Sequence, residues 1–118
     1  MFRPALLAAI ALSMGATAAQ ACSYDAGRDS LSTRPGATYA GAEGRDWFAA
    51  GALIVLDGDR YQKYGPPREF DDFDLESLGK AGAWKGVTLF TDVEGDAKVI
   101  YAPVNAARCT FQIYQRMD

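Results

Sequence analysis

The stretch LIVLDGDRYQKYGPPREF, residues 53–70, decides the fold of this chain. An aliphatic run, residues 52–56, is followed directly by Asp57 and Gly58, and residues 60–64 then alternate polar and aromatic side chains. An Asp-Gly pair readily adopts the positive backbone angles that a tight primed turn requires. We therefore expect a β-hairpin with Asp57 and Gly58 as its turn.

The same stretch predicts where the hairpin ends. Gly-Pro-Pro follows at 65–67, and proline has no backbone N–H to donate to a neighbouring strand. The register of the two strands is open, because either Tyr61 or Tyr64 can share a face with Val55.

The residues after the hairpin predict one short helix. The segment REFDDFDLESLGK, residues 68–80, is rich in acids, and acids are favoured at the positively polarised start of a helix. Asp72 or Asp74 is expected to cap this helix, and Leu75 and Leu78 are expected to face the core.

Three further strands are expected in the rest of the chain. Gly79 is predicted to end the helix, and residues 81–85 are predicted to form a turn that carries Trp84. A second hairpin is predicted from residues 87–91 and 98–102.

The last strand is predicted over residues 109–114, after Pro103 has closed the strand before it. Its alternation puts two sets of side chains on opposite faces: Cys109, Phe111 and Ile113 on one, and Thr110, Gln112 and Tyr114 on the other. About five short strands and one short helix predict a mainly β (α+β) fold. Its form is either a small twisted antiparallel sheet or a partly open roll of the SH3 or OB type.

Residues 1–21 are predicted to be a signal peptide. Arg3 lies in a short positive region, and the apolar segment 5–14 is too short to span a bilayer as a stable anchor. Small residues follow, and Ala-Gln-Ala at 19–21 matches an A-x-A cleavage site directly before Cys22.

Cleavage after residue 21 of 118 leaves 97 residues, enough for one small domain. Residues 22–44 are polar and glycine-rich with no sustained apolar period, so we expect a flexible linker. Residues 45–118 are expected to form a single small β-rich domain. No segment after the signal peptide is apolar enough to span a membrane.

The only two cysteines, Cys22 and Cys109, are predicted to form a disulfide. An exported chain meets an oxidising compartment, either the periplasm or the cell exterior, where such bonds persist. In the alternative, Cys22 carries a lipid anchor and Cys109 is a free, buried thiol. Bacterial lipidation prefers a leucine three residues before the cysteine, and this chain has Ala19 there.

Charge and composition narrow the possible functions. Without Arg3, 11 basic residues stand against 15 acidic ones, a net charge of −4. An acidic domain is a poor candidate for nucleic acid or an anionic membrane and can instead meet a basic protein. The chain has no histidine, the commonest general base and zinc ligand, so neither a metal nor another cofactor is expected.

Three acidic groups are candidates for a metal site or a reactive site. Asp57 and Asp59 flank a glycine but lack the further ligands of a calcium loop, which favours a turn. The other two groups are Glu69, Asp71, Asp72, Asp74 and Glu76, and Asp92, Glu94 and Asp96. Dense carboxylates can bind a hard cation, attract a cationic partner or support a carboxylate-dependent hydrolase. Capping and solvated turns are the preferred interpretation, because helix starts favour acids.

The remaining candidate is a recognition surface on or beside the first hairpin. It consists of aromatic and basic residues: Tyr61, Lys63, Tyr64, Arg68 and Trp84. Exposed aromatics beside arginine suit protein or glycan recognition, whereas the competing interpretation places the aromatics in the core. The sequence thus predicts a small, non-catalytic, exported bacterial envelope protein that binds a periplasmic protein or a cell-wall component. A lipid-anchored envelope protein and a hydrolase are the alternatives.

Overall fold

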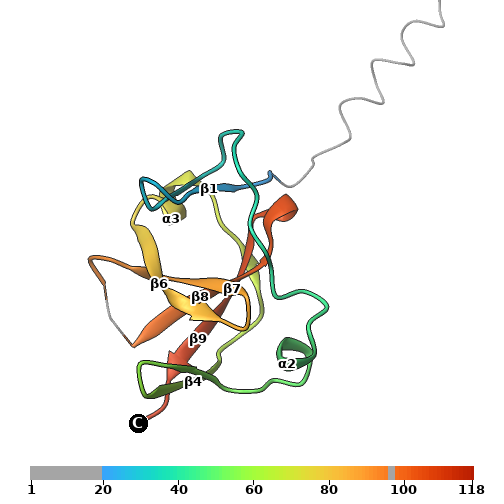
Figure 1. Ribbon diagram of the computed structural model, residues 1–118, viewed down its shortest axis with the longest axis vertical. Helices are drawn as coiled ribbons and strands as arrows, with labels where there is room; N and C mark the ends of the chain where they lie inside the picture. Colours follow the sequence, from blue (N-terminus) through green and yellow to red (C-terminus); the bar gives the residue numbers. More distant parts are fainter. Residues whose placement is uncertain (1–19, 96–97) are drawn as a thin grey trace, which may run out of the picture.

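A curled antiparallel sheet, a separate strand pair and two short α-helices make up the fold in the computed structural model, which describes residues 20–95 and 98–118 (Figure 1). In chain order the elements are β1 (Ser23–Asp25), β2 (Ser30–Ser32), α2 (Asp46–Ala49), β3 (Ile54–Leu56), β4 (Asp59–Lys63), β5 (Arg68–Glu69), α3 (Asp72–Leu75), β6 (Leu78–Trp84), β7 (Val87–Asp92), β8 (Val99–Asn105), the 3-10 helix η1 (Ala106–Arg108) and β9 (Thr110–Arg116). The predicted mainly β class is confirmed. Residues 1–19 of the predicted signal peptide lie outside the described residues.

The large sheet has the strand order β3-β4-β9-β8-β7-β6, with β5 also paired to β9. Strands β3 and β6 stand at the two ends of this order, yet the Leu56 side chain of β3 lies against Gly82 of β6. The sheet therefore curls toward closure, as in a partly open roll. No helix in the described part of the chain is long and apolar enough to cross a membrane.

The hairpin predicted from the Asp-Gly pair is confirmed as β3 and β4. Asp57 and Gly58 have φ values of 51° and 84°, the positive angles of a primed turn. The register pairs Ile54 with Tyr61, and both side chains are buried. Val55 is on the opposite face and is 44% exposed, so Tyr61 points into the core with Ile54.

A second primed turn, at Lys85 and Gly86, was not predicted. Their φ values are 47° and 86°, and they join β6 to β7. The expected turn at residues 81–85 is therefore wrong, because β6 continues to Trp84 with one register shift between Lys80 and Gly82. Pairing along β7 overrides the low strand propensity of the glycines and alanines in β6. The predicted hairpin of β7 and β8 is confirmed.

Pro103 does not end β8, contrary to expectation. It pairs with Phe111 of β9, and the register shifts immediately after it, before Asn105; such irregular positions tolerate proline. Cys109 precedes β9 and has a φ of 50°. Burial in β9 does not separate the two predicted sets, because Phe111 of one set and Gln112 and Tyr114 of the other are all buried. β9 is the central strand of a curled sheet, so its side chains meet apolar partners on both faces.

The predicted helix is confirmed as α3, but its cap and its end differ from expectation. Asp71, rather than Asp72 or Asp74, is the N-cap: its carboxylate accepts from the Asp74 N–H at 3.0 Å, and the Asp74 carboxylate accepts from the Asp71 N–H at 3.1 Å. The helix ends at Leu75, so Gly79 lies in β6 and does not stop it. Leu75 is buried as expected, and so is Leu78.

The expected flexible linker, residues 22–44, is wrong over much of its length. It contains the β1–β2 pair, and Leu31 and Ala42 are buried. The Ala42 N–H donates to the Pro103 carbonyl at 2.8 Å, so this segment extends along β8. Isolated apolar residues in a polar segment are enough to dock it, because they reach one shared core.

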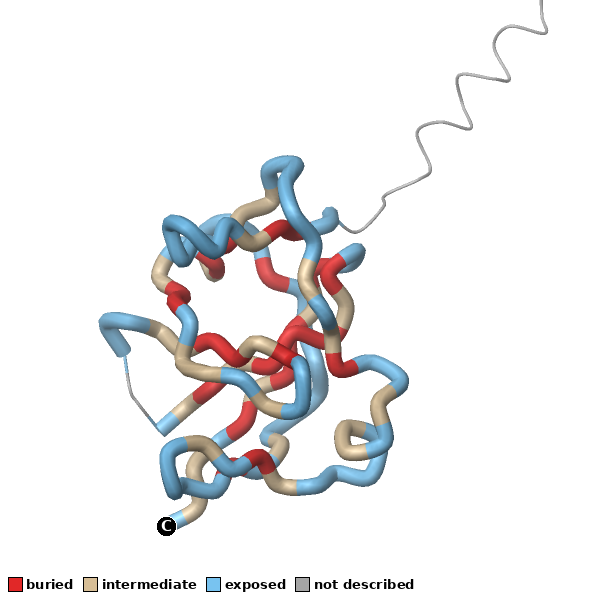
Figure 2. The backbone as a smooth tube through the Cα atoms, viewed as in Figure 1, coloured by how far each residue is buried: buried red, intermediate tan, exposed pale blue. Residues whose placement is uncertain are grey.

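The predicted disulfide is confirmed and lies in that core. Cys22 and Cys109 are bonded with a Cα–Cα distance of 5.0 Å. Tyr39 donates its O–H to Cys22 Sγ at 2.9 Å. One core cluster contains both cysteines with Leu31, Phe70, Leu75, Leu78, Phe90 and Phe111. Figure 2 shows the buried residues following the central strands, with exposed loops around them.

Candidate binding surface

Two of the five predicted surface residues lie at a second core cluster, whose buried members are Ile54, Tyr61, Leu89, Ile100, Ala102 and Tyr114. Tyr61 is 5% exposed and is a member of this cluster, and the half-buried Trp84 packs against it. Tyr61 therefore cannot contribute to a recognition surface. For this residue, the core interpretation is correct.

The other three predicted residues lie in the segment beside β9, where Lys63 pairs with Tyr114, Tyr64 donates its N–H to the Ile113 carbonyl and Arg68 pairs with Phe111. Lys63 is half-buried: its Nζ donates to the Phe48 carbonyl and lies 3.8 Å from the centre of the Phe48 ring, which ties α2 to β4. Tyr64 is 61% exposed, and Arg68 is exposed on β5. Of the five predicted residues, Arg68 lines the cleft that is described next.

That cleft has a volume of about 170 Å³ and is formed by β5, α3, the ends of β6 and β7, and β8. Its lining residues are Arg68, Phe70, Phe73, Asp74, Ser77, Leu78, Asp92 and Tyr101. We call it the aromatic cleft. Its lining residues Phe73 and Asp74 belong to α3, which lies far from α2 (Figure 1).

The base of the aromatic cleft is a set of packed rings. Phe70 is 5% exposed and stacks on Phe111 with ring centres 4.7 Å apart. Tyr101 meets Phe70 edge-on at 5.6 Å, and the Arg68 guanidinium lies 4.7 Å from the Phe70 ring centre. Such ring contacts hold the aromatic faces in fixed orientations.

Phe73 provides an exposed wall of the cleft. Its side chain is 78% exposed, the most exposed of the large hydrophobic residues described. It lies on α3, which the Asp71–Asp74 capping box holds at its start. Sequence reasoning missed this residue, although a signal existed: in a helix, a residue two positions from a buried Leu75 points to the opposite side.

The charge at the cleft is mainly negative. Asp74 and Asp92 line it, and neither forms an ion pair within residues 20–95 and 98–118. The pKa of Tyr101 is raised, first by burial and then by the charge of Asp92; Arg68 opposes this shift and Asp74 adds to it. The Tyr101 hydroxyl therefore experiences two carboxylates and one guanidinium.

Several of the acidic residues considered for metal binding have structural roles. Asp72 accepts hydrogen bonds from the Thr33 N–H at 2.9 Å and the Thr33 O–H at 2.8 Å, and these bonds lower its pKa. Asp59 faces Arg116 at 3.7 Å. Asp92 accepts from the Glu94 N–H at 2.9 Å. Among the described residues, no three potential ligands are grouped so that they could hold a metal ion. Of the third acidic group, residue 96 lies outside the described residues.

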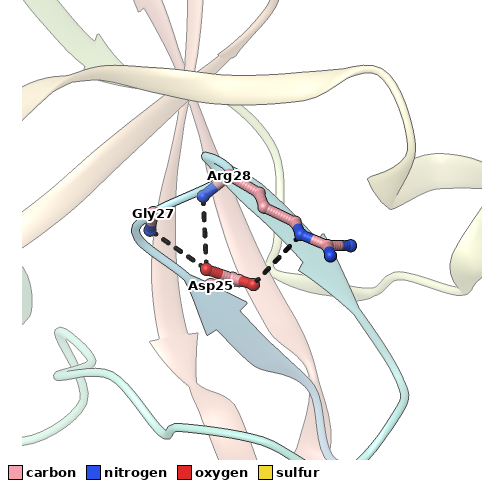
Figure 3. Close-up of polar contacts among 3 residues, drawn as sticks. All are labelled: Asp25, Gly27 and Arg28. Carbon is pink, nitrogen blue, oxygen red and sulfur yellow. Dashed lines mark hydrogen bonds and ion pairs between the residues drawn. The ribbon is translucent and has the colours of Figure 1, made fainter.

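Two further grooves, of about 450 and 460 Å³, flank the loop that follows β2, and Arg34 lines both. The second is also lined by Arg28. Asp25 holds this arginine within its own turn: it accepts from the Gly27 N–H at 3.0 Å and the Arg28 N–H at 3.2 Å, and lies 3.9 Å from Arg28 Nε (Figure 3). Arg28 thus has one carboxylate beside it, and its side chain stays 84% exposed.

Comparisons with protein-family models, with curated proteins and with solved structures found no match to this chain. The functional argument therefore rests on the chemistry of the residues themselves. Of the surfaces described, the aromatic cleft combines a formed hollow, exposed apolar area and carboxylates without ion pairs in the described structure.

Proposed function

We propose that this protein is an exported, non-catalytic domain that binds another protein through the aromatic cleft. The observation that carries the proposal is Phe73, a phenylalanine 78% exposed at the edge of a cleft built from packed rings. A single exposed apolar residue is ordinary on a protein surface. An exposed aromatic residue beside an arginine and a preformed hollow has the features of an interface anchor.

A non-catalytic role is supported by the reactive groups of the chain. The sequence has no histidine, and its two cysteines are joined to each other. The densest carboxylate cluster begins α3 and is engaged in its capping box and in binding Thr33. A carboxylate-dependent hydrolase would need these groups directed at a substrate instead.

Export is supported by the disulfide together with the amino-terminal sequence. Structural disulfides persist in oxidising compartments, and Cys22 follows the predicted cleavage site directly. In the disulfide, Cys22 Sγ is bonded to Cys109 and cannot also carry a lipid. The Cys22 sulfur can therefore form this disulfide or carry a lipid, but it cannot do both.

The intact mass of the protein from its own cells, measured without reducing agent, tests export and anchoring. We expect the mass of residues 22–118 less two hydrogens. A mass increased by a diacylglyceryl group would contradict the disulfide and establish the lipid anchor. An unprocessed mass would contradict export.

Photo-crosslinking in living cells tests binding at the cleft. A photoreactive phenylalanine analogue replaces Phe73 in one variant and Tyr64, the other strongly exposed aromatic residue, in a matched control. We expect a discrete protein adduct from position 73, identified by mass spectrometry, and none from position 64. No adduct from position 73, or the same mixture from both positions, would refute binding at this cleft.

A further inference from the structure

We infer that the aromatic cleft receives a single basic side chain, arginine or lysine, presented by the partner protein. This inference rests on the proposed function and adds the chemistry of the partner. The structure supports it through the size of the cleft, its rings and its charge.

The size of the cleft suits one side chain. Its volume of about 170 Å³ is well below the ~300–1,000 Å³ of typical small-molecule pockets. A flat protein surface cannot fill such a hollow, whereas one long side chain projecting from it can. Phe73, at the cleft edge, would then contact the surface around that side chain.

The rings and carboxylates suit a cation. Aromatic faces attract ammonium and guanidinium groups, and carboxylates form charge-assisted hydrogen bonds with them. The chain itself provides an example of the first contact, because the Arg68 guanidinium already lies over Phe70 at 4.7 Å. Asp74 and Asp92, with no ion pair to any described residue, are available for the second contact.

The negative charge that would attract a basic partner also lies around the cleft and on the domain as a whole. Arg68 is the single basic residue that lines the cleft, and the segments that supply Asp74 and Asp92 carry further acids, among them Asp71 and Glu94. The domain after cleavage has a net charge of −4, from 11 basic and 15 acidic residues. Complementary charge steers encounters and selects partners, so a basic partner is favoured over an acidic one.

Substitution of Arg68 distinguishes a cationic guest from an anionic one. Its side chain is exposed, so it can withdraw when a guest enters. If the guest is a cation, Arg68 repels it, and Arg68→Met should strengthen binding while keeping an unbranched side chain over Phe70. If the guest is an anion, the same substitution should abolish binding.

The inference is tested by titrating the labelled protein with Nα-acetyl-arginine N-methylamide and following its NMR signals. The norleucine analogue is the apolar control and the glutamate analogue the anionic control. We expect the arginine probe alone to shift the signals of Phe73, Asp74, Asp92 and Tyr101. Asp74→Asn with Asp92→Asn should weaken this binding roughly tenfold, as expected for two partly exposed charge contacts. These amides retain acceptors for the backbone N–H groups that each aspartate binds.

A matched control removes two charges at the opposite end of the molecule. Asp46→Asn with Asp57→Asn changes the net charge equally, on α2 and in the β3–β4 turn, and should leave the affinity unchanged. Equal binding of the norleucine probe, binding of the glutamate probe, equal weakening by the control variant, or no shift at the cleft would each overturn the inference.

The crosslink from position 73 separates this inference from the proposed function. If the adduct forms and is reduced by Asp74→Asn with Asp92→Asn but not by the control pair, both stand. An adduct that is indifferent to the two substitutions contradicts the basic guest and leaves partner binding intact. Absence of the adduct refutes the binding function itself.

Discussion

Replacing Gly41 by alanine is expected to detach the segment after it from β8. A Cβ at this position would approach the Val104 carbonyl oxygen far more closely than the sum of the two van der Waals radii and would lie 2.8 Å from its carbonyl carbon. Backbone atoms in a paired strand cannot move aside cheaply, so the segment must move. Its Ala42 and Glu43 N–H groups donate to β8 carbonyls at 2.8 and 3.1 Å, and Ala42 is fully buried.

The cost follows from these contacts. Two backbone hydrogen bonds contribute about 0.5–1.5 kcal/mol each, and exposing the Ala42 methyl group costs about 0.8 kcal/mol. Alanine also restricts the unfolded chain, which returns about 0.4–1 kcal/mol. The expected net loss in the free energy of unfolding is about 1–3 kcal/mol, a large part of the ~5–15 kcal/mol typical of a domain.

Urea unfolding measures this loss, and Gly27→Ala is the matched control. A Cβ on Gly27 would meet only Asp25 Oδ1, at an ordinary 3.4 Å, so this variant should keep its stability. Hydrogen exchange at the amides of Ala42 and Glu43 should accelerate in Gly41→Ala alone. If the two variants unfold at the same urea concentration and these amides exchange alike, the segment does not pack on β8, and the flexible linker predicted from the sequence would be correct.

Three further substitutions test other parts of the fold. Cys22→Ala with Cys109→Ala opens a loop whose ends are 87 residues apart. The chain-entropy model predicts that the free energy of unfolding in urea falls by about 4–5 kcal/mol. A fall of under ~1 kcal/mol would contradict this model. Asp72→Asn should lower the melting temperature at pH 7. Because hydrogen bonds from Thr33 depress the folded pKa of Asp72 below its ordinary value near 3.8, the stabilisation is present above that value and is lost as pH falls through the folded pKa. The difference between the two proteins should therefore vanish in acid, and a constant difference would refute this account. Tyr114→Phe removes a fully buried hydroxyl that has no hydrogen-bond partner in the described structure and whose pKa burial raises to about 12. It should leave thermal stability unchanged or raise it by about 1 kcal/mol, and a clear loss would show that the hydroxyl is bonded.

Local signals in the sequence were enough for the first hairpin, the short helix and the disulfide. Asp57 and Gly58 supply a turn whose geometry depends on two adjacent residues, so no distant contact is needed to predict it. The acids before Leu75 mark a helix start in the same local way. The disulfide followed from counting, since only Cys22 and Cys109 can pair.

The features that the sequence did not predict depend on distant contacts. The sequence predicts a helix end at Gly79 and a turn over residues 81–85, but the segment LGKAGAW, residues 78–84, forms β6 because β7 pairs along it. This pairing overrides the weak strand propensity of glycine and alanine. Residues 22–44 read as a linker, although Asp29 of the β1–β2 turn accepts hydrogen bonds from the Tyr24 hydroxyl at 2.7 Å and the Lys80 N–H at 2.9 Å. The contact between Lys80 and Asp29 joins residues 51 positions apart, so the local pattern around either residue does not predict it.

The aromatic cleft depends on a local signal, the cap of α3, and on distant contacts between strands. It also bears on the two interpretations of the acidic cluster, helix capping and attraction of a cationic partner. Asp71 and Asp74 cap α3, and this cap fixes the helix so that Leu75 points into the core and Phe73 points outward. Asp74 receives the backbone N–H of Asp71 through Oδ2, and Oδ1 and the negative charge stay available to a guest. Capping and attraction of a cationic partner are therefore compatible roles of one carboxylate. The local pattern of acids suggests both roles, whereas the cleft proposed for the guest also needs Tyr101, which comes from β8 and lines the same hollow as Asp74.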